Sequence, residues 1–311
     1  MTEQKRAART PINVDDPAGL SEALAGEGYI CSHEIAVTAW LALALQRPLL
    51  VEGPAGVGKT ELARALAAAT GREMVRLQCY EGLDEARALY EWDYARQLLY
   101  TQMLRERLGE AVAGAGSLPE AVRLLKREEG AFFSRDFLLP RPLLKAILSP
   151  RPALLLVDEV DRSDPEFEAF LLEVLADFQV SVPELGTLRA QTRPAAILTS
   201  NAQRSLSEAL RRRCLYLYLD YPSFDVELRI VRAKVPGLDE RLAREAVRLA
   251  QKARKLDLRK APSIGETLDW TAAILLLNAP SLSRDILVKT LSALLKDRDD
   301  VEKFLREAAR G

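Results

Sequence analysis

The sequence is poor in the residues that build metal centres and disulfide frameworks. Among 311 residues it has one histidine and three widely separated cysteines, Cys31, Cys79 and Cys214. These numbers exclude a histidine metal cluster, disfavour a catalytic triad, and argue against a disulfide framework or a structural zinc site. The cysteine usage fits a reducing compartment, so we expect a cytoplasmic protein.

A charge imbalance and long apolar runs are also missing. With 44 basic and 45 acidic residues the formal net charge is −1, which favours neither nucleic acid nor a membrane surface as a partner. The longest mostly apolar stretch, residues 36–45, is too short to span a membrane, and residues 1–10 lack the apolar core of a signal peptide. We therefore expect neither membrane insertion nor export.

The most informative motif is a glycine-rich loop that follows an apolar run at residues 48–51. It fits the pattern G-x-x-x-x-G-K-[ST], in which backbone N–H groups surround a triphosphate, the lysine reaches the outer phosphates and the final hydroxyl binds Mg²⁺. A helix is predicted from Glu61 to Ala69, with its positive N-terminal end toward the anion. The sequence thus predicts nucleotide binding by Gly53, Pro54, Ala55, Gly56, Val57, Gly58, Lys59, Thr60 and Glu61.

Strand and helix signals alternate over the first two thirds of the chain. Apolar runs predict strands at residues 48–51, 74–78, 153–157 and 195–199, with helices between them. This order implies an α/β fold with a parallel sheet, helices on both faces and ligands at the carboxyl ends of the strands. Beyond residue 221 only helical periods remain.

We therefore predict a flexible tail at residues 1–18, an α/β core at 19–221 and a small all-α domain, the lid, at 222–311. The long interval at residues 84–130 carries apolar and aromatic residues near one helical face, which predicts an inserted helical hairpin. Its aromatic face either packs on the core or docks a partner.

Two carboxylates, Asp158 and Glu159, directly follow the apolar third strand. In this position Asp158 would hold the Mg²⁺ shell, while Glu159 would orient and polarise the water that attacks the terminal phosphate. The alternative is a strand that ends in solvated acids. The phosphate loop earlier in the chain favours the hydrolysis site.

The fourth strand ends in Thr199-Ser200-Asn201. We expect the Asn201 amide to hydrogen-bond the attacking water and a phosphate oxygen. Asn201 could instead start a turn or cap a helix, in which case Thr199 or Ser200 would take the sensing role.

Three consecutive arginines, residues 211–213, end a predicted helix before another apolar strand. On a monomer they would form a solvated face. Beside the motifs above they favour an arginine finger that reaches the nucleotide of a neighbouring subunit, with Arg213 preferred over Arg212. A finger supplied by a neighbour makes hydrolysis depend on assembly, for which a closed ring is the natural geometry.

The ordered motifs resemble those of the AAA+ ATPases, and within them the MoxR branch. The resemblance covers about residues 25–280 and rests on the phosphate loop and on residues 156–162, 170–180 and 199–201. It implies a P-loop NTPase that hydrolyses ATP with Mg²⁺, assembles as a homo-oligomeric ring, expected to be a hexamer, and remodels a protein client. It also implies a β-hairpin directed at the ring pore, matched by residues 179–189, and a von Willebrand factor A-type partner protein.

The resemblance further implies contacts to the nucleotide outside the loop. Tyr29 and Ile30 occupy the segment that wraps the base in relatives. Many relatives also carry a lid arginine that senses the terminal phosphate, but the matching residues 261–270 contain none. Arg259 or Lys260 could replace it, or the lid is coupled more loosely to the nucleotide.

The insert and residues 266–270 resemble the subgroup associated with maturation of carbon monoxide dehydrogenase-type molybdenum enzymes. That subgroup implies metal-cofactor assembly in a client metalloenzyme. Two other functions stay open. A nucleic-acid-translocating motor would need a basic pore hairpin, whereas residues 179–189 hold one arginine and one glutamate. A nucleotide-gated binding module with little hydrolysis is disfavoured by Asp158, Glu159 and Asn201.

Overall fold

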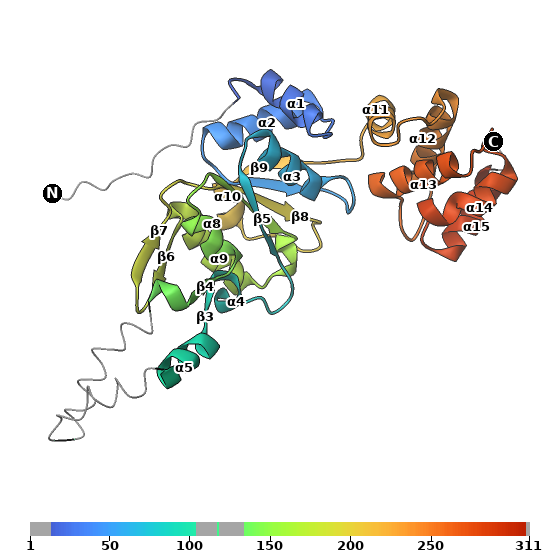
Figure 1. Ribbon diagram of the computed structural model, residues 1–311. Helices are drawn as coiled ribbons and strands as arrows, with labels where there is room; N and C mark the ends of the chain where they lie inside the picture. Colours follow the sequence, from blue (N-terminus) through green and yellow to red (C-terminus); the bar gives the residue numbers. More distant parts are fainter. Residues whose placement is uncertain (1–13, 104–116, 118–133, 309–311) are drawn as a thin grey trace. The chain divides into compact units, whose positions relative to one another are not determined.

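The computed structural model describes residues 14–103, 117 and 134–308 of the chain (Figure 1). The described residues form two compact units, each with its own set of strands and helices. The described residues of the first unit are 72–103, 117, 134–198 and 206–213. Those of the second unit are 14–71, 199–205 and 214–308.

Five strands form a parallel sheet in the order β2-β5-β8-β1-β9. In the first unit β2 pairs with β5 from Glu73 opposite Ala153, and in the second β1 pairs with β9 from Leu49 opposite Leu215. Every residue of β1 and β5 is buried, as expected for strands covered on both faces. The predicted parallel sheet with helices is therefore confirmed. The strands are β1 (Leu49–Glu52), β2 (Glu73–Gln78), β5 (Ala153–Asp158), β8 (Ala195–Ser200) and β9 (Leu215–Tyr218).

The helices α1 and α2 begin at residues that cap them. The Asp16 carboxylate accepts from Gly19 N at 2.7 Å and starts α1, and the Ser32 hydroxyl accepts from Ile35 N at 3.4 Å and starts α2. In the first unit α8 packs on β2 and β5, and in the second α2 packs on β9. The bounds are α1 (Pro17–Gly26), α2 (His33–Ala44), α3 (Lys59–Ala69), α8 (Pro142–Leu148), α9 (Pro165–Asp177) and α10 (Glu208–Arg213).

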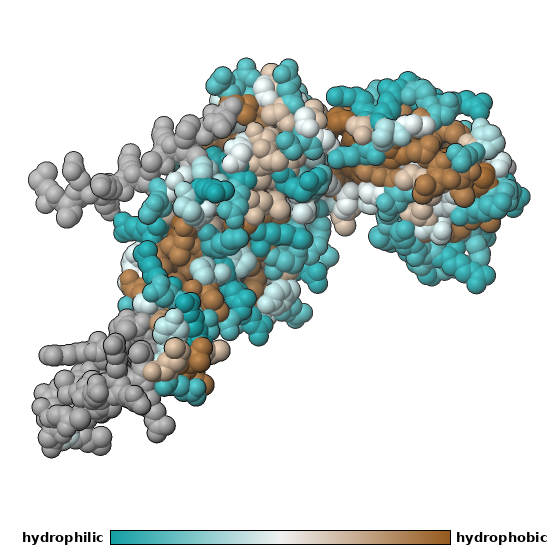
Figure 2. All heavy atoms as spheres, viewed as in Figure 1, coloured by the Kyte–Doolittle hydropathy of each residue, from teal (hydrophilic) through white to brown (hydrophobic). Residues whose placement is uncertain are grey.

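The C-terminal region is entirely helical, as predicted, and its helices share an apolar core. Trp270 is fully buried there with Leu291 and Phe304, and its indole N–H donates to Thr290 Oγ1 at 2.8 Å. Apolar residues also gather on the viewed face of these helices (Figure 2). The elements are α11 (Phe224–Lys234), α12 (Glu240–Arg254), α13 (Ile264–Leu276), α14 (Arg284–Leu294) and α15 (Arg298–Ala308).

The described part of the expected helical insert contains a short strand as well as helices. After α4 (Glu85–Leu89), residues Tyr90–Trp92 form β3, which pairs antiparallel with β4 (Leu138–Pro140), and α5 (Tyr94–Met103) follows. Helical periodicity did not predict β3, because its partner strand lies far away in the sequence. The rest of the expected insert, residues 104–116 and 118–130, lies outside the described residues.

The β-hairpin predicted at residues 179–189 is present. Strand β6 (Gln179–Val182) pairs with β7 (Gly186–Arg189), and Gly186 closes the turn with a φ of +72°. Of the predicted N-terminal tail, residues 1–13 lie outside the description, and α1 begins at Pro17, slightly before the expected start of structure at Gly19. Within the ranges described, no helix is both long and apolar enough to cross a membrane.

Candidate nucleotide site

The phosphate loop connects β1 to α3, and its glycines adopt backbone conformations that other residues rarely reach. Gly58, the N-cap of α3, has a φ of +97° and offers no side chain to cap the helix. The N-terminal end of α3 carries the partial positive charge of a helix end, and an anion suits this position. The loop and helix thus fit the triphosphate that the motif predicts, with Thr60 an exposed residue in the first turn of α3.

Lys59 and Asn201 meet in the second unit. The Lys59 ammonium donates to the carbonyl oxygens of Gly53 and Pro54 at 2.7 and 2.8 Å, and to Asn201 Oδ1 at 2.8 Å. An ammonium has three N–H donors, so each has an acceptor. In addition, Gly53 N donates to Ser200 O at 3.3 Å. Two residues predicted to face the outer phosphates therefore share a hydrogen bond, although the sequence separates them by 142 positions.

Asp158 is the last residue of β5, in the first unit, and its side chain is only 4% exposed. Its Oδ2 accepts from Arg76 Nε at 2.9 Å and Arg76 Nη2 at 2.6 Å. Arg76 lies on β2, the strand paired with β5. Sequence analysis did not single out Arg76, because only the pairing of β2 with β5 places its guanidinium beside Asp158.

Glu159 has a left-handed backbone, with φ 57° and ψ 50°, which is strained for a residue with a side chain. Its Oε2 accepts from Gln78 Nε2 at 2.9 Å and from Arg162 Nη1 at 3.0 Å. Gln78 is the last residue of β2, two positions after Arg76, and the side chains of both reach the carboxylate pair. These two donors hold the Glu159 carboxylate in place, and sequence analysis missed both.

Tyr29 lies against the phosphate loop. A Cβ atom added at Gly58 would be 3.6 Å from Tyr29 Cε2. Burial, together with the nearby Cys31 and Glu61, raises the pKa of Tyr29 above its ordinary value. The neighbouring Ile30 is half-buried.

A lysine of α11 lies beside the same segment. Lys234 Nζ is 3.9 Å from Glu61 Oε1 and would be 2.8 Å from a Cβ atom added at Gly28. Lys234 therefore lies close to Glu61, which follows the loop, and to Gly28, which precedes Tyr29. Lys234 carries no motif in the sequence and was missed.

The first turn of α13 contacts the phosphate loop directly. Ile264 N donates to Gly56 O at 3.2 Å, and a Cβ atom added at Gly56 would be 2.2 Å from Ser263 Cβ. Ser263 and Glu266 form a capping box, in which Ser263 Oγ accepts from Glu266 N and Glu266 Oε2 accepts from Ser263 N. Only glycine at position 56 allows this close approach.

The two candidates for the missing lid arginine are held by acidic residues within the helical region. Arg259 forms ion pairs with Asp297 at 3.0 Å and Asp299 at 2.7 Å, and Lys260 pairs with Glu266 at 3.0 Å. Ser263 and Ile264 of the lid, in contrast, contact the loop at Gly56.

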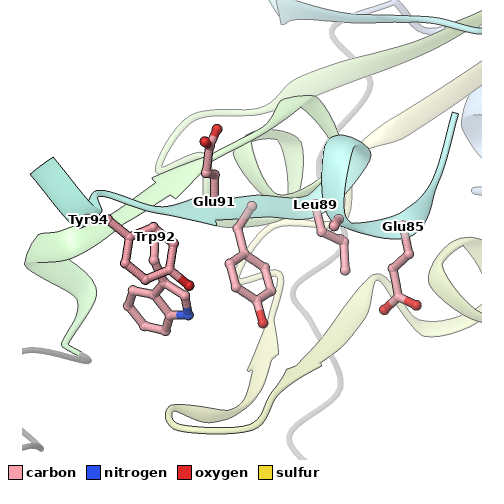
Figure 3. A pocket seen from close by; sticks show the side chains of 7 residues that line it. Glu85, Leu89, Glu91, Trp92 and Tyr94 are labelled. Atoms are coloured by element: carbon pink, nitrogen blue, oxygen red, sulfur yellow. The ribbon is translucent and has the colours of Figure 1, made fainter.

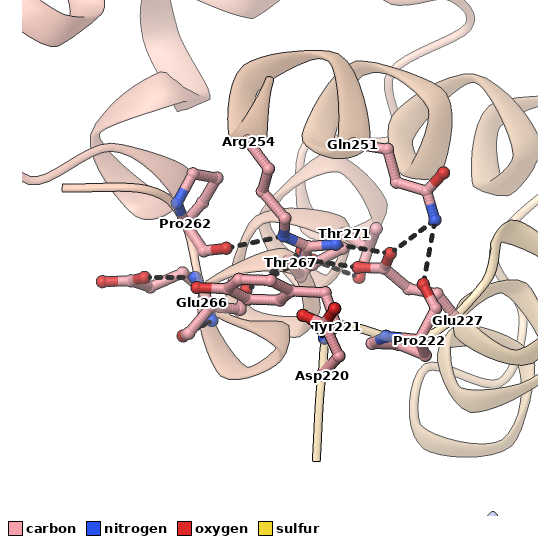
Figure 4. A network of polar contacts seen from close by, with 11 residues as sticks. Asp220, Tyr221, Pro222, Glu227, Gln251, Arg254, Pro262, Glu266, Thr267 and Thr271 are labelled. Atoms are coloured by element: carbon pink, nitrogen blue, oxygen red, sulfur yellow. Dashed lines mark hydrogen bonds and ion pairs between the residues drawn. The ribbon is translucent and has the colours of Figure 1, made fainter. Parts of the chain in front are cut away.

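A buried polar network fixes the segment that leads into α13 (Figure 4). Arg254 donates to both carboxylate oxygens of Glu227 at 2.6 and 2.7 Å and to the Pro262 carbonyl at 2.7 Å. Its guanidinium also lies 4.6 Å from the centre of the Tyr221 ring. Arg254 of α12 thereby connects Glu227 of α11 and Tyr221 with Pro262, the residue before Ser263.

The candidate finger arginines lie on α10, and both are exposed. The Arg213 guanidinium donates to the Leu172 carbonyl of α9, and Arg212 pairs with Glu208 one turn earlier. Their action on a neighbouring subunit stays a prediction.

A parallel sheet with this loop, a carboxylate pair at a strand end and a helical C-terminal region defines a P-loop NTPase. The chain matches the model of the AAA domain (dynein-related subfamily) over residues 48–214, which is more than half of its length. It therefore belongs to this family of AAA+ proteins. The family match confirms the predicted resemblance to the MoxR-type AAA+ ATPases.

Two relatives extend the similarity over most of the chain. Protein NorQ of Paracoccus denitrificans is 29% identical over 272 residues, which cover 86% of this chain and 87% of that protein. Gas vesicle ATPase GvpN of Haloferax mediterranei is 28% identical over 285 residues, which cover 86% of this chain and 74% of that protein. Among solved structures, a mutant of Thermotoga maritima RuvB has a TM-score of 0.48 and 17% identity, covering 85% of this chain and 70% of that one.

Proposed function

We propose that this chain hydrolyses ATP to ADP and phosphate and uses the energy to remodel a protein client. Its AAA+ family membership and its similarity to a protein named as an ATPase support the reaction. The observation that carries the proposal is the hydrogen bond between Lys59 and Asn201. This bond joins the phosphate-binding ammonium to the amide proposed to sense the terminal phosphate.

In this proposal the loop of Gly53 to Thr60 and the N-terminus of α3 bind the triphosphate. Lys59 exchanges its contacts to the Gly53 and Pro54 carbonyls for phosphate oxygens, because charged acceptors bind an ammonium more strongly than carbonyl groups do. Asn201 then orients the attacking water, and Tyr29 and Ile30 contact the base.

Glu159 is the proposed general base, and it takes the proton of the attacking water as the new bond to phosphorus forms. Gln78 and Arg162 keep its carboxylate oriented. The hydroxyl of Thr60 and the carboxylate of Asp158 are oxygen donors of the kind that Mg²⁺ prefers, and they would hold it. When bound, Mg²⁺ neutralises charge on the β- and γ-phosphate oxygens.

The proposed assembly is a homo-oligomeric ring, expected to be a hexamer. Arg213, or Arg212 as the second choice, would complete a neighbour's site by stabilising charge on the transferred phosphoryl group. The proposed partner is a von Willebrand factor A-type protein. The proposed client is a metalloenzyme that needs its metal cofactor assembled, such as a molybdenum hydroxylase of the carbon monoxide dehydrogenase type.

A pair of substitutions tests the hydrolysis mechanism. Glu159→Gln is expected to keep ATP affinity but to lower kcat by roughly 10²- to 10⁴-fold, the usual contribution of a general base. Lys59→Ala is expected to weaken ATP binding itself. The matched control is Glu166→Gln, which changes an exposed glutamate in the first turn of α9 and should leave kcat and affinity unchanged. Normal hydrolysis by Glu159→Gln would overturn the role of Glu159.

Two further measurements test assembly and client. Turnover per subunit should rise with protein concentration, in parallel with ring formation seen by mass measurement. Constant turnover in a preparation that contains only monomer would contradict the finger supplied by a neighbour.

Affinity capture with Glu159→Gln in the presence of ATP should retain the client, and recovery of nucleic acid without protein would favour a translocating motor.

A further inference from the structure

A pocket of the first unit lies between α4, β3 and the start of α5 (Figure 3). Its volume is about 440 Å³, which falls in the usual range of ligand pockets, roughly 300–1,000 Å³. Three aromatic residues, Tyr90, Trp92 and Tyr94, and two glutamates, Glu85 and Glu91, line it. None of the roles proposed above uses these residues.

The aromatic rings form one wall of the pocket. Tyr90 and Trp92 alternate on β3 and therefore share a face of the strand, and their rings meet edge-to-face with centroids 5.9 Å apart. Tyr94 lies beside Trp92, on the side of the strand opposite to the Glu91 carboxylate (Figure 3). Tyr94 is 65% exposed, so much of its ring is open to a ligand.

The charged residues that line the pocket are two glutamates, Glu85 and Glu91. No lysine or arginine is among its lining residues. The Glu91 carboxylate pairs with Arg141, whereas Glu85 forms no ion pair with any residue in the described ranges. A further carboxylate, that of Glu184, acts on Tyr90 from the turn of the β6–β7 hairpin. Burial, followed by Glu184 and Glu85, raises the pKa of Tyr90 above its ordinary value.

We propose that this pocket binds the guanidinium group of an arginine side chain presented by a client protein. Aromatic faces attract cations, and the planar guanidinium can stack on them while it pairs with a carboxylate. Glu85 supplies that carboxylate, and the electrostatic effect of Glu184 on Tyr90 links the pocket to the hairpin. The exposed apolar residues Leu98, Leu99 and Met103 follow Tyr94 on α5 and suit the rest of a peptide segment.

This proposal rests on the proposed function at one point, because it assumes that the arginine belongs to a protein client. Affinity for an arginine peptide can be measured without ATP. The probe is a fluorescein-labelled glycine-serine peptide that carries arginines, and its twin carries citrulline, which has nearly the same shape but no charge. Fluorescence anisotropy with the full chain is expected to show about 5- to 30-fold tighter binding of the arginine peptide, the range for an aromatic–cation contact. The difference should shrink as salt is added.

Two substitutions locate the binding. Glu85→Gln and Tyr94→Ala are each expected to reduce affinity for the arginine peptide by about two- to fivefold, and both side chains are exposed enough to be replaced without unfolding the chain. The matched controls are Glu81→Gln and Tyr218→Ala, which change an exposed glutamate and an exposed tyrosine outside the pocket. Both controls should bind as the unchanged chain does.

Equal binding of the arginine and citrulline peptides would overturn the proposal. It would also be overturned if the pocket variants and the control variants behaved alike, because the binding would then be a general charge effect. ATP turnover, measured in parallel, separates the two proposals. Turnover without arginine selectivity removes only the pocket, whereas arginine selectivity in a chain that never hydrolyses ATP removes the remodelling function and leaves the pocket.

Discussion

Arg254 and Glu227 form a two-pronged ion pair inside the helical region, with N–O distances of 2.6 and 2.7 Å (Figure 4). Their side chains are 7% and 0% exposed. Gln251 donates a further hydrogen bond to Glu227, and Thr267 Oγ1 accepts one from Arg254. The pair therefore has the additional partners that buried charges need, and it connects α11 and α12 with the first turns of α13.

Breaking this pair is expected to destabilise the chain strongly. Arg254→Ala leaves the Glu227 carboxylate buried without its counter-charge, which typically costs about 3–5 kcal/mol. Urea unfolding should show this loss. The matched control is Arg244→Ala, which removes a pair with Glu240 that is 45% and 49% exposed and is expected to cost below about 1 kcal/mol. An equal loss of unfolding free energy in the two variants would show that the buried pair stabilises the chain no more than the exposed pair does.

Gln78 is expected to act on hydrolysis through Glu159. Gln78→Ala removes the hydrogen bond from Gln78 Nε2 to Glu159 Oε2, so the carboxylate should spend less time aimed at the attacking water. We expect kcat to fall by about 10- to 100-fold, the scale of small misplacements of a catalytic group, while ATP affinity is unchanged. Gln102→Ala, at an exposed position of α5, is the control. A change in ATP affinity without a change in kcat would contradict this positioning role.

Arg76 is expected to compete with Mg²⁺ for Asp158. Its guanidinium donates twice to Asp158 Oδ2, and a cation already paired with a carboxylate lowers the affinity of that carboxylate for another. The Arg76 side chain is 49% exposed, so its contribution is modest, about 0.5–1 kcal/mol. In Arg76→Met the Mg²⁺ concentration for half-maximal turnover should fall about two- to fivefold. An increase would mean instead that Arg76 holds Asp158 in its Mg²⁺-binding orientation.

The parts of the site that the sequence predicts are those carried by contiguous residues. The phosphate loop, the Asp158-Glu159 pair and the β-hairpin each depend on a short stretch in which side-chain type and backbone conformation follow from local rules. The positions of the predicted strands also agree with the structure, because each strand is a short apolar run between helical stretches.

The partners of those residues could not be predicted, since they depend on chain pairing. Arg76 and Gln78 reach the carboxylates only because β2 lies beside β5, and about 80 residues separate the hydrogen-bonded groups. Strand β3 also needs a distant partner, β4. Ser263 contacts Gly56 because the lid packs on the loop, and no sequence pattern around either residue predicts this contact.

The contact between Ser263 and Gly56 gives a prediction about how the lid is coupled to the nucleotide. Gly56→Ala is expected to weaken ATP binding, because its φ of +77° is strained for alanine and the new Cβ would lie 2.2 Å from Ser263 Cβ. Gly71→Ala is the matched control, since its φ is +64° and its Cβ would meet no described atom within 4 Å. The control should lose about 1 kcal/mol of stability, the cost of placing alanine in a left-handed backbone conformation, and should keep its ATP affinity. Adding Ser263→Gly to Gly56→Ala removes the clashing atom, so ATP affinity measured by titration should partly return. If it does not return, the loop backbone alone decides nucleotide binding, and the lid contact at Ser263 has no part in it.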